Sequence, residues 1–276
     1  MQVTHDLQRK CDALQRSIGA LKNVLVAFSG GVDSTFLLKT CIDVLGRENA
    51  IAFTGLSPTY PHSEKEEAQK VAASMGVRVV TVNSSEMEDE NFLMNTPERC
   101  YHCKSHLFTS AWEIARQEGC FFVLEGSNVD DLKDFRPGRK ACTELDVKSP
   151  LLEAGLTKDE IRILSRKLGL ATHNKPAQAC LSSRIPYGVP ITLERLGSIE
   201  RSEAFLRALG MSQVRVRHHG NIARIEVEEK DFPIILKNRD QIATGLERSG
   251  FTYITLDLHG YRTGSMNETI KKGHDE

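Results

Sequence analysis

The sequence predicts an α/β fold, in which a parallel sheet carries helices on both faces, followed by a smaller α+β domain. Short apolar runs alternate with stretches of helical periodicity, as in a parallel sheet with right-handed crossovers. These runs lie at residues 24–28, 50–54, 77–82 and 121–125. A long amphipathic stretch and a hairpin pattern then indicate the second part. We expect the two domains at residues 1–188 and 189–276.

Apolar residues at helical spacing, glycine stops and two capping boxes predict five helices in the first domain. They cover residues 7–18, 34–46, 63–76, 100–119 and 157–169. The capping boxes begin at Ser63 and Thr157. The stretches 84–97 and 134–148 show no clear period, so we expect irregular structure there.

The second domain follows an irregular connection at residues 175–188. Its expected elements are a helix, a hairpin, a second helix and a last strand. They lie at residues 193–209, 214–228, 231–250 and 253–258. In the hairpin, Val214 and Val216 alternate with Arg215 and Arg217, which predicts a strand with both arginines on one face.

Composition narrows the functional classes. The chain has 276 residues, with 36 Lys and Arg against 37 Asp and Glu. This balance gives no electrostatic case for binding nucleic acid or membranes. The first residues lack the apolar core of a signal peptide, and no window approaches a transmembrane span. We therefore expect a cytoplasmic protein, in which seven cysteines do not form a disulfide framework.

The glycine loop after the first strand, S-G-G-V-D-S at residues 29–34, is the organising feature of the first domain. Glycines let the backbone approach a phosphate, and the following helix directs its N–H groups and positive dipole end at the loop. We expect Ser29, Gly30, Gly31 and Ser34 to bind nucleotide phosphates. Asp33 would repel a bare phosphate, so its presence indicates a bridging Mg²⁺.

A second loop, residues 126–131, follows the fourth strand at the same edge of the sheet. It offers polar and acidic groups, and Asn128 is a candidate for contacting the nucleotide.

Three cysteines form a second constellation. Cys100-x-x-Cys103 has the spacing of a metal or redox pair, and Cys180, in another irregular connection, is the natural third ligand. A [4Fe–4S] cluster on these cysteines would leave one iron open. Zinc with His102 or His106 as a further ligand, and a metal-free pair of thiols, remain alternatives. Cys120 is expected to pack at a strand edge, and the role of Cys142 is undecided.

Four arginines are candidates for a second anion site, because the guanidinium fork matches phosphate and carboxylate. They are Arg184, Arg215, Arg217 and Arg262.

The glycine loop resembles the S-G-G-x-D-S loop of the PP-loop ATP pyrophosphatases, which include NAD and GMP synthetases and tRNA thiolases. The stretch P-L-L-E-A-G-L-T-K-D-E-I-R from Pro150 is similar to the one that follows the ATP site in several of these enzymes.

Motifs along the whole chain resemble the LarE family of PP-loop sulfur transferases. These motifs are A-C-L-S-S-R-I-P-Y-G, V-R-V-R-H-H with I-A-R-I-E, and T-L-D-L-H-G-Y-R-T-G-S-M-N-E near the end. The family makes the thiocarboxylates of the nickel-pincer nucleotide cofactor of lactate racemase. The resemblance implies that ATP adenylylates a carboxylate of a pyridinium-3,5-dicarboxylic acid mononucleotide, releasing pyrophosphate, and that sulfur then displaces AMP.

The resemblance also assigns residues. The residues that line the substrate and sulfur-transfer pocket would be Lys104, Ser183, Glu203, Arg215, Arg217 and Arg262. Some family members sacrifice one cysteine as sulfur donor, whereas others hold a [4Fe–4S] cluster on three cysteines. Cys100, Cys103 and Cys180 indicate the cluster type; in the sacrificial type, Cys180 would be the donor. Homo-oligomers are expected, and the source of sulfide is not indicated.

Two other functions remain open. A tRNA thiolase would require a basic RNA-binding surface, which the balanced charge does not favour. A nucleotide-binding or cluster-sensing protein without turnover would bind ATP but release no pyrophosphate.

Overall fold

The computed structural model describes residues 4–133, 137–176, 178–262 and 264–267. The chain divides into two compact units. Unit 1 comprises the described residues of Met1–Phe92 and Pro97–Gln178, and unit 2 comprises those of Leu93–Thr96 and Ala179–Glu276. The domain limits 1–188 and 189–276 remain a prediction. Residues 134–136 of the stretch predicted to be irregular, and Thr263 and Glu268 of the last motif, lie outside the described residues.

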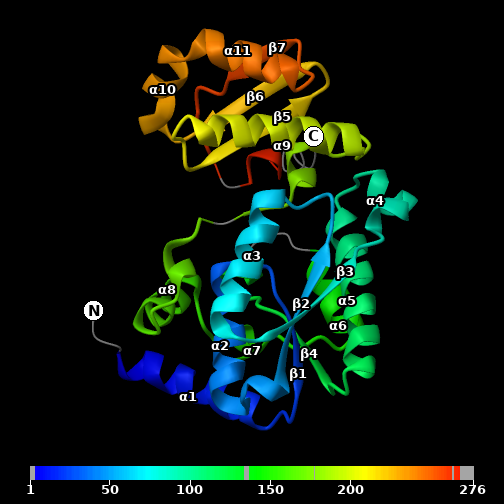
Figure 1. Cartoon of the computed structure of the whole chain (residues 1–276), viewed down its shortest axis with the longest axis vertical. Coiled ribbons are helices and arrows are strands. Elements are labelled where there is room, and N and C mark those ends of the chain that lie inside the picture. The colour runs from blue at the N-terminus through cyan, green and yellow to red at the C-terminus, as the bar shows by residue number, and fades with distance from the viewer. Residues whose placement is uncertain (1–3, 134–136, 177, 263, 268–276) are drawn as a thin grey trace. The chain divides into compact units, whose positions relative to one another are not determined.

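Unit 1 is built on a four-stranded parallel sheet with the order β3-β2-β1-β4 (Figure 1). The strands are β1 (Val24–Ala27), β2 (Ala50–Leu56), β3 (Arg78–Asn83) and β4 (Phe122–Leu124). The central strand β1 pairs with β2 on one side and with β4 on the other. This confirms the predicted α/β class. The loop that follows β1 therefore lies at the carboxyl edge of the sheet, where parallel sheets bind ligands.

Alternate residues of β1 serve two separate cores, because side chains of a strand point to opposite faces. Val24 and Val26 pack in the cluster formed with α1 (His5–Gly19), α2 (Val32–Leu45) and α8 (Lys158–Lys167). Leu25 packs in the cluster that contains Phe108 and Ala111 of α5 (Arg99–Gln117). Figure 1 shows α2 and α3 (His62–Met75) on one side of the sheet and α5 with α6 (Gly138–Glu144) on the other. Helices on both faces are confirmed.

Three local predictions for unit 1 were wrong. The Ser63 capping box is absent, because α3 begins one residue earlier, after Pro61, without a side-chain cap. The stretch 84–97 contains a 3₁₀ turn and α4 (Glu90–Leu93). The stretch 134–148 contains α6, whose Ala141 and Cys142 are buried in the core. Two apolar residues in a polar segment are too few to show a helical period. The Thr157 capping box is present and opens α8; α7 (Pro150–Glu153) precedes it.

Unit 2 has a three-stranded mixed sheet with helices on its apolar face. The hairpin is confirmed, since β5 (Val214–His219) pairs antiparallel with β6 (Ile222–Val227). β7 (Tyr253–Leu256) then pairs parallel with β6. The remaining helices of the unit are α9 (Leu193–Ala208), α10 (Phe232–Lys237) and α11 (Arg239–Arg248). The single helix predicted over 231–250 is thus two helices divided at Asn238. Leu193, the first residue of α9, is 62% exposed.

Residues 93–96 belong to unit 2 although they are surrounded in sequence by unit 1. Asn95 is buried, and its side-chain amide donates hydrogen bonds to the carbonyl oxygens of Pro186 and Val189 at 2.8 and 3.0 Å. This short segment therefore stabilises the connection that precedes α9. Across the described residues, the helices are all too short or too polar to span a membrane.

Candidate active site

The glycine loop between β1 and α2 is folded by its own two serines. The hydroxyls of Ser29 and Ser34 lie 3.1 Å apart, and the Ser34 hydroxyl accepts from the Ser29 amide at 3.3 Å. Helix α2 begins after Gly31, and no side chain caps its N-terminus. Its first N–H groups, together with the positive end of the helix dipole, can therefore serve an anion bound at the loop.

Two glycines allow this loop to pack tightly. Gly30 has φ +69°, and a Cβ added there would lie 2.7 Å from the Cα of Ala68 on α3. Gly126, which follows β4, lies behind the loop, where a Cβ would be 3.1 Å from the Ser34 amide nitrogen. Gly30 is required both for its left-handed backbone conformation and for lack of space, and Gly126 is required for lack of space alone.

Asp33 forms an ion pair that the sequence did not predict. The Nζ of Lys158, the first residue of α8, lies 2.5 Å from Asp33 Oδ2. The capping box at Thr157 fixes the start of α8 and so brings this lysine to the first turn of α2. The T-K-D-E stretch predicts the helix cap, but nothing in the sequence indicates that Lys158 reaches Asp33.

A second lysine holds the other side of the loop. Lys175 Nζ lies 3.4 Å from the Gly30 carbonyl oxygen and 2.8 Å from a carboxylate oxygen of both Glu64 and Glu67 on α3. Burial alone would lower the pKa of Lys175, but the hydrogen bonds to the two glutamates raise it above its ordinary value. The loop is thus bordered by Lys158 and Lys175.

Asn128 shapes the second loop. Its side-chain oxygen accepts a hydrogen bond from the main-chain amide of Asp130 at 2.9 Å, and its main-chain amide donates to the Asp131 carboxylate at 2.9 Å. Asp130 in turn accepts from the Lys158 amide at 2.9 Å. These bonds join the loop after β4 to the start of α8, which supports the position of Lys158.

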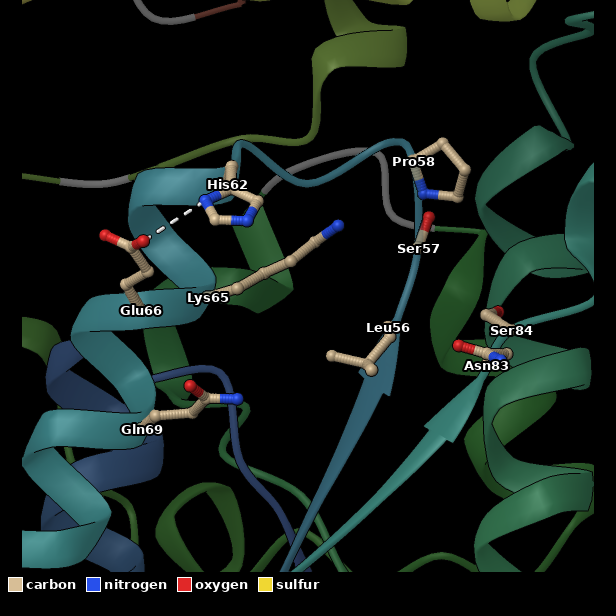
Figure 2. Close-up of a pocket in the computed structure, with 9 residues that line it drawn as sticks. All are labelled: Leu56, Ser57, Pro58, His62, Lys65, Glu66, Gln69, Asn83 and Ser84. Atoms are coloured by element: carbon tan, nitrogen blue, oxygen red, sulfur yellow. Dashed lines mark ion pairs between the residues drawn. The ribbon is translucent and has the colours of Figure 1, made fainter.

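A pocket of about 630 Å³ opens at the carboxyl ends of β2 and β3, next to the strand that carries the glycine loop (Figure 2). Leu56 extends from β2 and Lys65 from α3 into the space between these elements (Figure 2). Beside it, the fully buried carboxylate of Glu86 accepts hydrogen bonds from the hydroxyls of Ser57 and Ser84. The pocket therefore combines an apolar wall with polar groups at fixed positions.

Cys100 and Cys103 lie in the first turns of α5, and both are partly exposed. His102 and His106 face Asp89 instead: His106 Nε2 lies 3.0 Å and His102 Nδ1 3.6 Å from Asp89 Oδ2. Among the described residues, no group of three Cys, His, Asp or Glu side chains forms a ready metal site. The zinc alternative with His102 or His106 therefore receives no support from their contacts.

The other cysteines differ from this pair. All seven lie in the described part of the chain, and none forms a disulfide there. Burial raises the pKa of Cys11 and Cys120, that of Cys142 to about 11 and that of Cys41 to about 12. Thiolates are the metal ligands, so these four are poor ligands and behave as small apolar residues.

Lys104 follows the cysteine pair on α5. Its Nζ lies 4.9 Å from the centre of the Phe108 ring. Its stem packs at Gly138, where an added Cβ would lie 2.9 Å from the Lys104 Cγ. The start of α6 is thus fitted closely against the turn that carries the cysteines.

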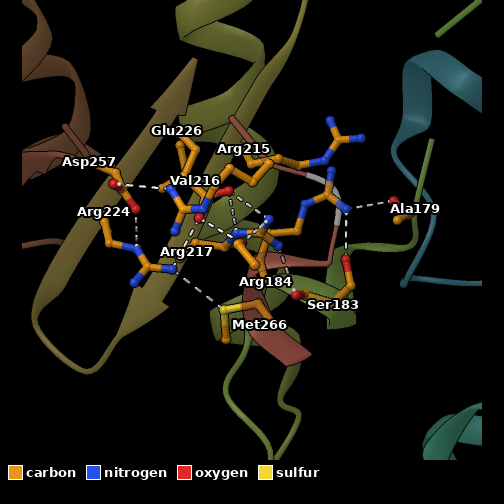
Figure 3. A network of polar contacts seen from close by, with 12 residues as sticks. Ala179, Ser183, Arg184, Arg215, Val216, Arg217, Arg224, Glu226, Asp257 and Met266 are labelled. Atoms are coloured by element: carbon orange, nitrogen blue, oxygen red, sulfur yellow. Dashed lines mark hydrogen bonds and ion pairs between the residues drawn. The ribbon is translucent and has the colours of Figure 1, made fainter. Parts of the chain in front are cut away.

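The polar face of the unit 2 sheet carries a network of arginines and carboxylates (Figure 3). The ion pairs are Arg184–Glu203, Arg207–Glu203, Arg217–Glu226, Arg224–Glu226, Arg224–Asp257 and Arg262–Asp257, with N···O distances from 2.7 to 3.6 Å. The sequence predicted the arginines but missed Glu226 and Asp257, because the register of β5, β6 and β7 creates these contacts.

Arg215 is the most strongly perturbed member of this face. It is 3% exposed, donates to the Val214 carbonyl at 2.8 Å and lies 5.5 Å from the Tyr261 ring. Burial and the neighbouring Arg184 lower its pKa to about 10. Burial is the larger cause of this shift, and the charge of Arg184 adds to it, so Arg215 lies close to a second guanidinium group.

Cys180 and Ser183 lie next to this network. Cys180 is partly exposed and precedes a 3₁₀ turn, Leu181–Arg184. Its carbonyl oxygen accepts from the Ser183 hydroxyl at 2.8 Å, and the Ser183 carbonyl accepts from Arg217 at 3.1 Å. The structure thus joins Cys180, Ser183 and the arginines in unit 2, while Cys100, Cys103 and Lys104 belong to unit 1.

Comparison with known proteins points in one direction. Residues 7–105 match the NAD synthase family. The chain is 42% identical to an uncharacterised protein of Synechocystis sp., covering 96% of this chain and all of the relative. It is 38% identical to the pyridinium-3,5-bisthiocarboxylic acid mononucleotide synthase of Lactiplantibacillus plantarum, covering 96% of both chains. A tRNA-specific 2-thiouridylase of Clostridioides difficile is 28% identical over 56% of this chain and 53% of its own.

Proposed function

The chain belongs to the LarE family of ATP-dependent sulfur-transferring enzymes, and from this membership we propose its reaction. It adenylylates a carboxylate of pyridinium-3,5-dicarboxylic acid mononucleotide and releases pyrophosphate. A sulfur nucleophile then attacks the activated carbonyl carbon, AMP leaves, and a thiocarboxylate remains. Adenylylation is required because the oxygen of a carboxylate is a poor leaving group, whereas AMP is a good one.

The glycine loop supplies the phosphate site in this proposal. The open N-terminus of α2, with Ser29, Gly30, Gly31 and Ser34, binds the departing pyrophosphate through N–H and O–H donors. Asp33 is the residue that would hold Mg²⁺. When bound, this ion would neutralise part of the negative charge of the phosphates.

Lys158 extends this assignment. It now pairs with Asp33, and a metal ion on that carboxylate would release its ammonium group for a phosphate oxygen. The pocket at Leu56 and Lys65 lies one strand away from the loop, a suitable place for the nucleoside of ATP. Asn128 supports the site by holding the loop that contacts α8.

The arginine face is the proposed site for the anionic groups of the mononucleotide. Arg215, Arg217 and Arg262 would bind its phosphate or its second carboxylate, as the family resemblance implies. The support is electrostatic: five arginines share three carboxylates, and the buried Arg215 lies beside them with its pKa lowered to about 10. Lys104 and Ser183 retain the pocket roles implied by the resemblance.

We propose that sulfur is delivered from the three-cysteine site. The choice of cysteines is supported by their exposure: Cys100, Cys103 and Cys180 are partly exposed, whereas burial raises the pKa of the thiols of Cys11, Cys41, Cys120 and Cys142. When bound, a [4Fe–4S] cluster supplies an open iron that can carry sulfide. The sacrificial use of Cys180 as direct donor is the alternative within the same reaction.

One observation carries the proposal: a chain of this family combines an uncapped helix over a glycine loop with a network in which five arginines share three carboxylates. The test is to measure pyrophosphate release anaerobically with ATP, with and without the pyridinium mononucleotide, and to identify the thiocarboxylate by mass spectrometry. We expect pyrophosphate release to depend on the mononucleotide. Release that ignores this substrate would overturn the proposal.

A matched variant separates the two half-reactions. Cys180→Ala should retain pyrophosphate release and lose the thiocarboxylate, because the cysteine acts only in the second step. The mass of the protein after turnover distinguishes the two possible sulfur sources, the cluster and the Cys180 side chain. Loss of sulfur from the protein mass after one turnover would select sacrifice, and repeated turnover with unchanged mass would select the cluster.

The second candidate, a tRNA thiolase, rests on the 28% identity to a thiouridylase over about half of each chain. The net charge of −1 does not favour it, since RNA binding depends on basic surface. Tight binding of tRNA in a filter assay at moderate salt would support this candidate instead.

A further inference from the structure

Arg184 is completely buried, and its guanidinium divides its donors between two partners. Nε and Nη2 donate to the two carboxylate oxygens of Glu203 at 2.8 and 3.0 Å. Nη1 donates to the carbonyl oxygens of Ala179 and Cys180 at 2.6 and 2.9 Å, and to the Ser183 hydroxyl at 3.0 Å. One side chain thus binds the carbonyl groups of the peptide bonds before and after Cys180. Figure 3 shows the contacts of Arg184 with Ala179 and Ser183.

Glu203, the partner of Arg184, is itself held in place by other groups. It is fully buried on α9 and accepts a hydrogen bond from the Val216 amide of β5 at 3.1 Å and another from Arg207 at 2.8 Å. Burial alone would raise the pKa of Glu203, but the charges of Arg184, Arg215 and Arg207 lower it below its ordinary value. The carboxylate therefore stays ionised, and it links helix, sheet and Arg184 in one rigid arrangement.

A substrate anion has no place at Arg184. Its side chain is 0% exposed, and all three of its nitrogens already donate to Glu203 or to the segment 179–183. An anion would have to displace Glu203, which would leave a buried carboxylate without its counterion. The bidentate geometry is that of a structural Arg–carboxylate pair.

We propose that Arg184 and Glu203 are positioning residues for Cys180, acting on its main chain and not on the substrate. The pair fixes the point from which the Cys180 thiol projects, and this inference rests on the proposed role of Cys180 in sulfur delivery. Sulfur transfer needs this control, because a nucleophile displaced by about 1 Å can lose on the order of a hundredfold in rate. The sequence suggests anion binding for Arg184, and the family resemblance implies a place in the substrate and sulfur-transfer pocket for Glu203; both roles are replaced here by positioning.

The experiment measures the rate at which iodoacetamide alkylates Cys180, by peptide mass spectrometry on the full-length protein without a cluster, with Cys11 as internal reference. In the double variant Arg184→Met/Glu203→Leu, apolar groups of similar size replace the buried pair, an exchange that folded proteins tolerate. We expect this variant to unfold near the wild-type temperature and to alkylate Cys180 on the order of tenfold faster, because its carbonyl anchors are lost. Alkylation at the wild-type rate in the folded double variant would overturn the proposal.

Two single variants complete the test. Arg184→Lys keeps a charge for Glu203 but cannot reproduce the planar fork to the two carbonyls, so it should also speed alkylation. Arg207→Gln removes the other partner of Glu203, does not touch the segment 179–183, and should leave the rate unchanged. An equal effect of Arg207→Gln would contradict the proposed path. Since alkylation needs neither ATP nor the mononucleotide, failure of this inference is distinct from failure of the proposed function.

Discussion

The two anion sites of this chain are built in opposite ways. The glycine loop uses main-chain N–H groups, two hydroxyls and one partly exposed Asp33–Lys158 pair. The arginine face uses buried side chains, among which Glu203 and Glu226 have no exposed surface. Main-chain dipoles at a helix N-terminus need no counterions. Buried guanidinium groups require carboxylates, and each lost partner leaves a costly unpaired charge.

Because of this difference, we expect substitutions at the two sites to affect different properties of the protein. Substitutions at the glycine loop should change chemistry with little effect on stability, provided that they respect its geometry. Substitutions that leave one buried arginine or glutamate without its partner should instead lower the stability of unit 2, whereas replacing both partners by apolar groups should be tolerated. The following predictions test this contrast.

Asp33→Asn should have the largest effect on chemistry. The substitution keeps the shape of the side chain but removes the charge that would hold Mg²⁺. We expect pyrophosphate release to fall by about 10²- to 10³-fold, as for loss of one preorganised electrostatic partner. The melting temperature should change little, because the Lys158 pair is partly exposed. Steady-state pyrophosphate assays with a thermal melt check both parts, and a large loss of stability would break the comparison.

Glu226→Gln should give the reverse result. The Glu226 carboxylate accepts from Arg217 at 2.7 Å, from Arg224 at 3.0 Å and from the Ser265 hydroxyl at 2.8 Å. Loss of its charge leaves buried Arg217 uncompensated, and we expect a loss of about 3 kcal/mol in the free energy of unfolding, measured in urea.

The matched control for Glu226 is Glu228→Gln, two residues away. Glu228 is 43% exposed and pairs with exposed Lys230, so its loss should cost under about 0.5 kcal/mol. Equal effects of the two substitutions would show that burial does not set the cost of lost charge in this sheet.

Gly30→Ala should fall between these cases, since it disturbs the loop by geometry alone. Gly119 has nearly the same backbone conformation, φ +68°, but nothing lies within 4 Å of its Cβ position. We expect Gly119→Ala to cost about 1 kcal/mol and Gly30→Ala about 2 to 3 kcal/mol, because only Gly30 meets Ala68. Urea unfolding of both variants isolates the steric part, and similar costs would contradict the close packing of the loop on α3.

The same contrast explains what the sequence could predict. The parallel sheet and the glycine loop follow from contiguous signals, apolar runs and S-G-G-V-D-S, whose physics is local. The partners Lys158 and Glu226 could not be read in this way. Lys158 reaches Asp33 only because α8 starts beside α2, and Glu226 meets Arg217 only through the register of a hairpin. Helix α6 was missed because burial against α5, and not periodicity, stabilises it.

The smallest predicted effect concerns pH and the two histidines that end β5. Burial lowers the pKa of His218 and His219 below the ordinary value of 6.5. His218 is 9% exposed and its ring contacts Phe251 edge-on, with centroids 5.2 Å apart. Since the folded state disfavours the protonated form, the unfolded chain takes up protons first as the pH falls below 6.5, and stability then declines.

The size of this decline is bounded by linkage at about 1.4 kcal/mol per pH unit for each histidine. We expect the urea midpoint of the wild-type chain to fall between pH 7.0 and pH 5.5, and His218→Leu to reduce that fall. This window lies above the titration of Glu203 and Asp257, whose lowered pKa values place their loss of stability at more acid pH. If His218→Leu leaves the slope unchanged, the neutral ring of His218 is not what makes this sheet sensitive to acid, and His219→Gln becomes the variant that must flatten it.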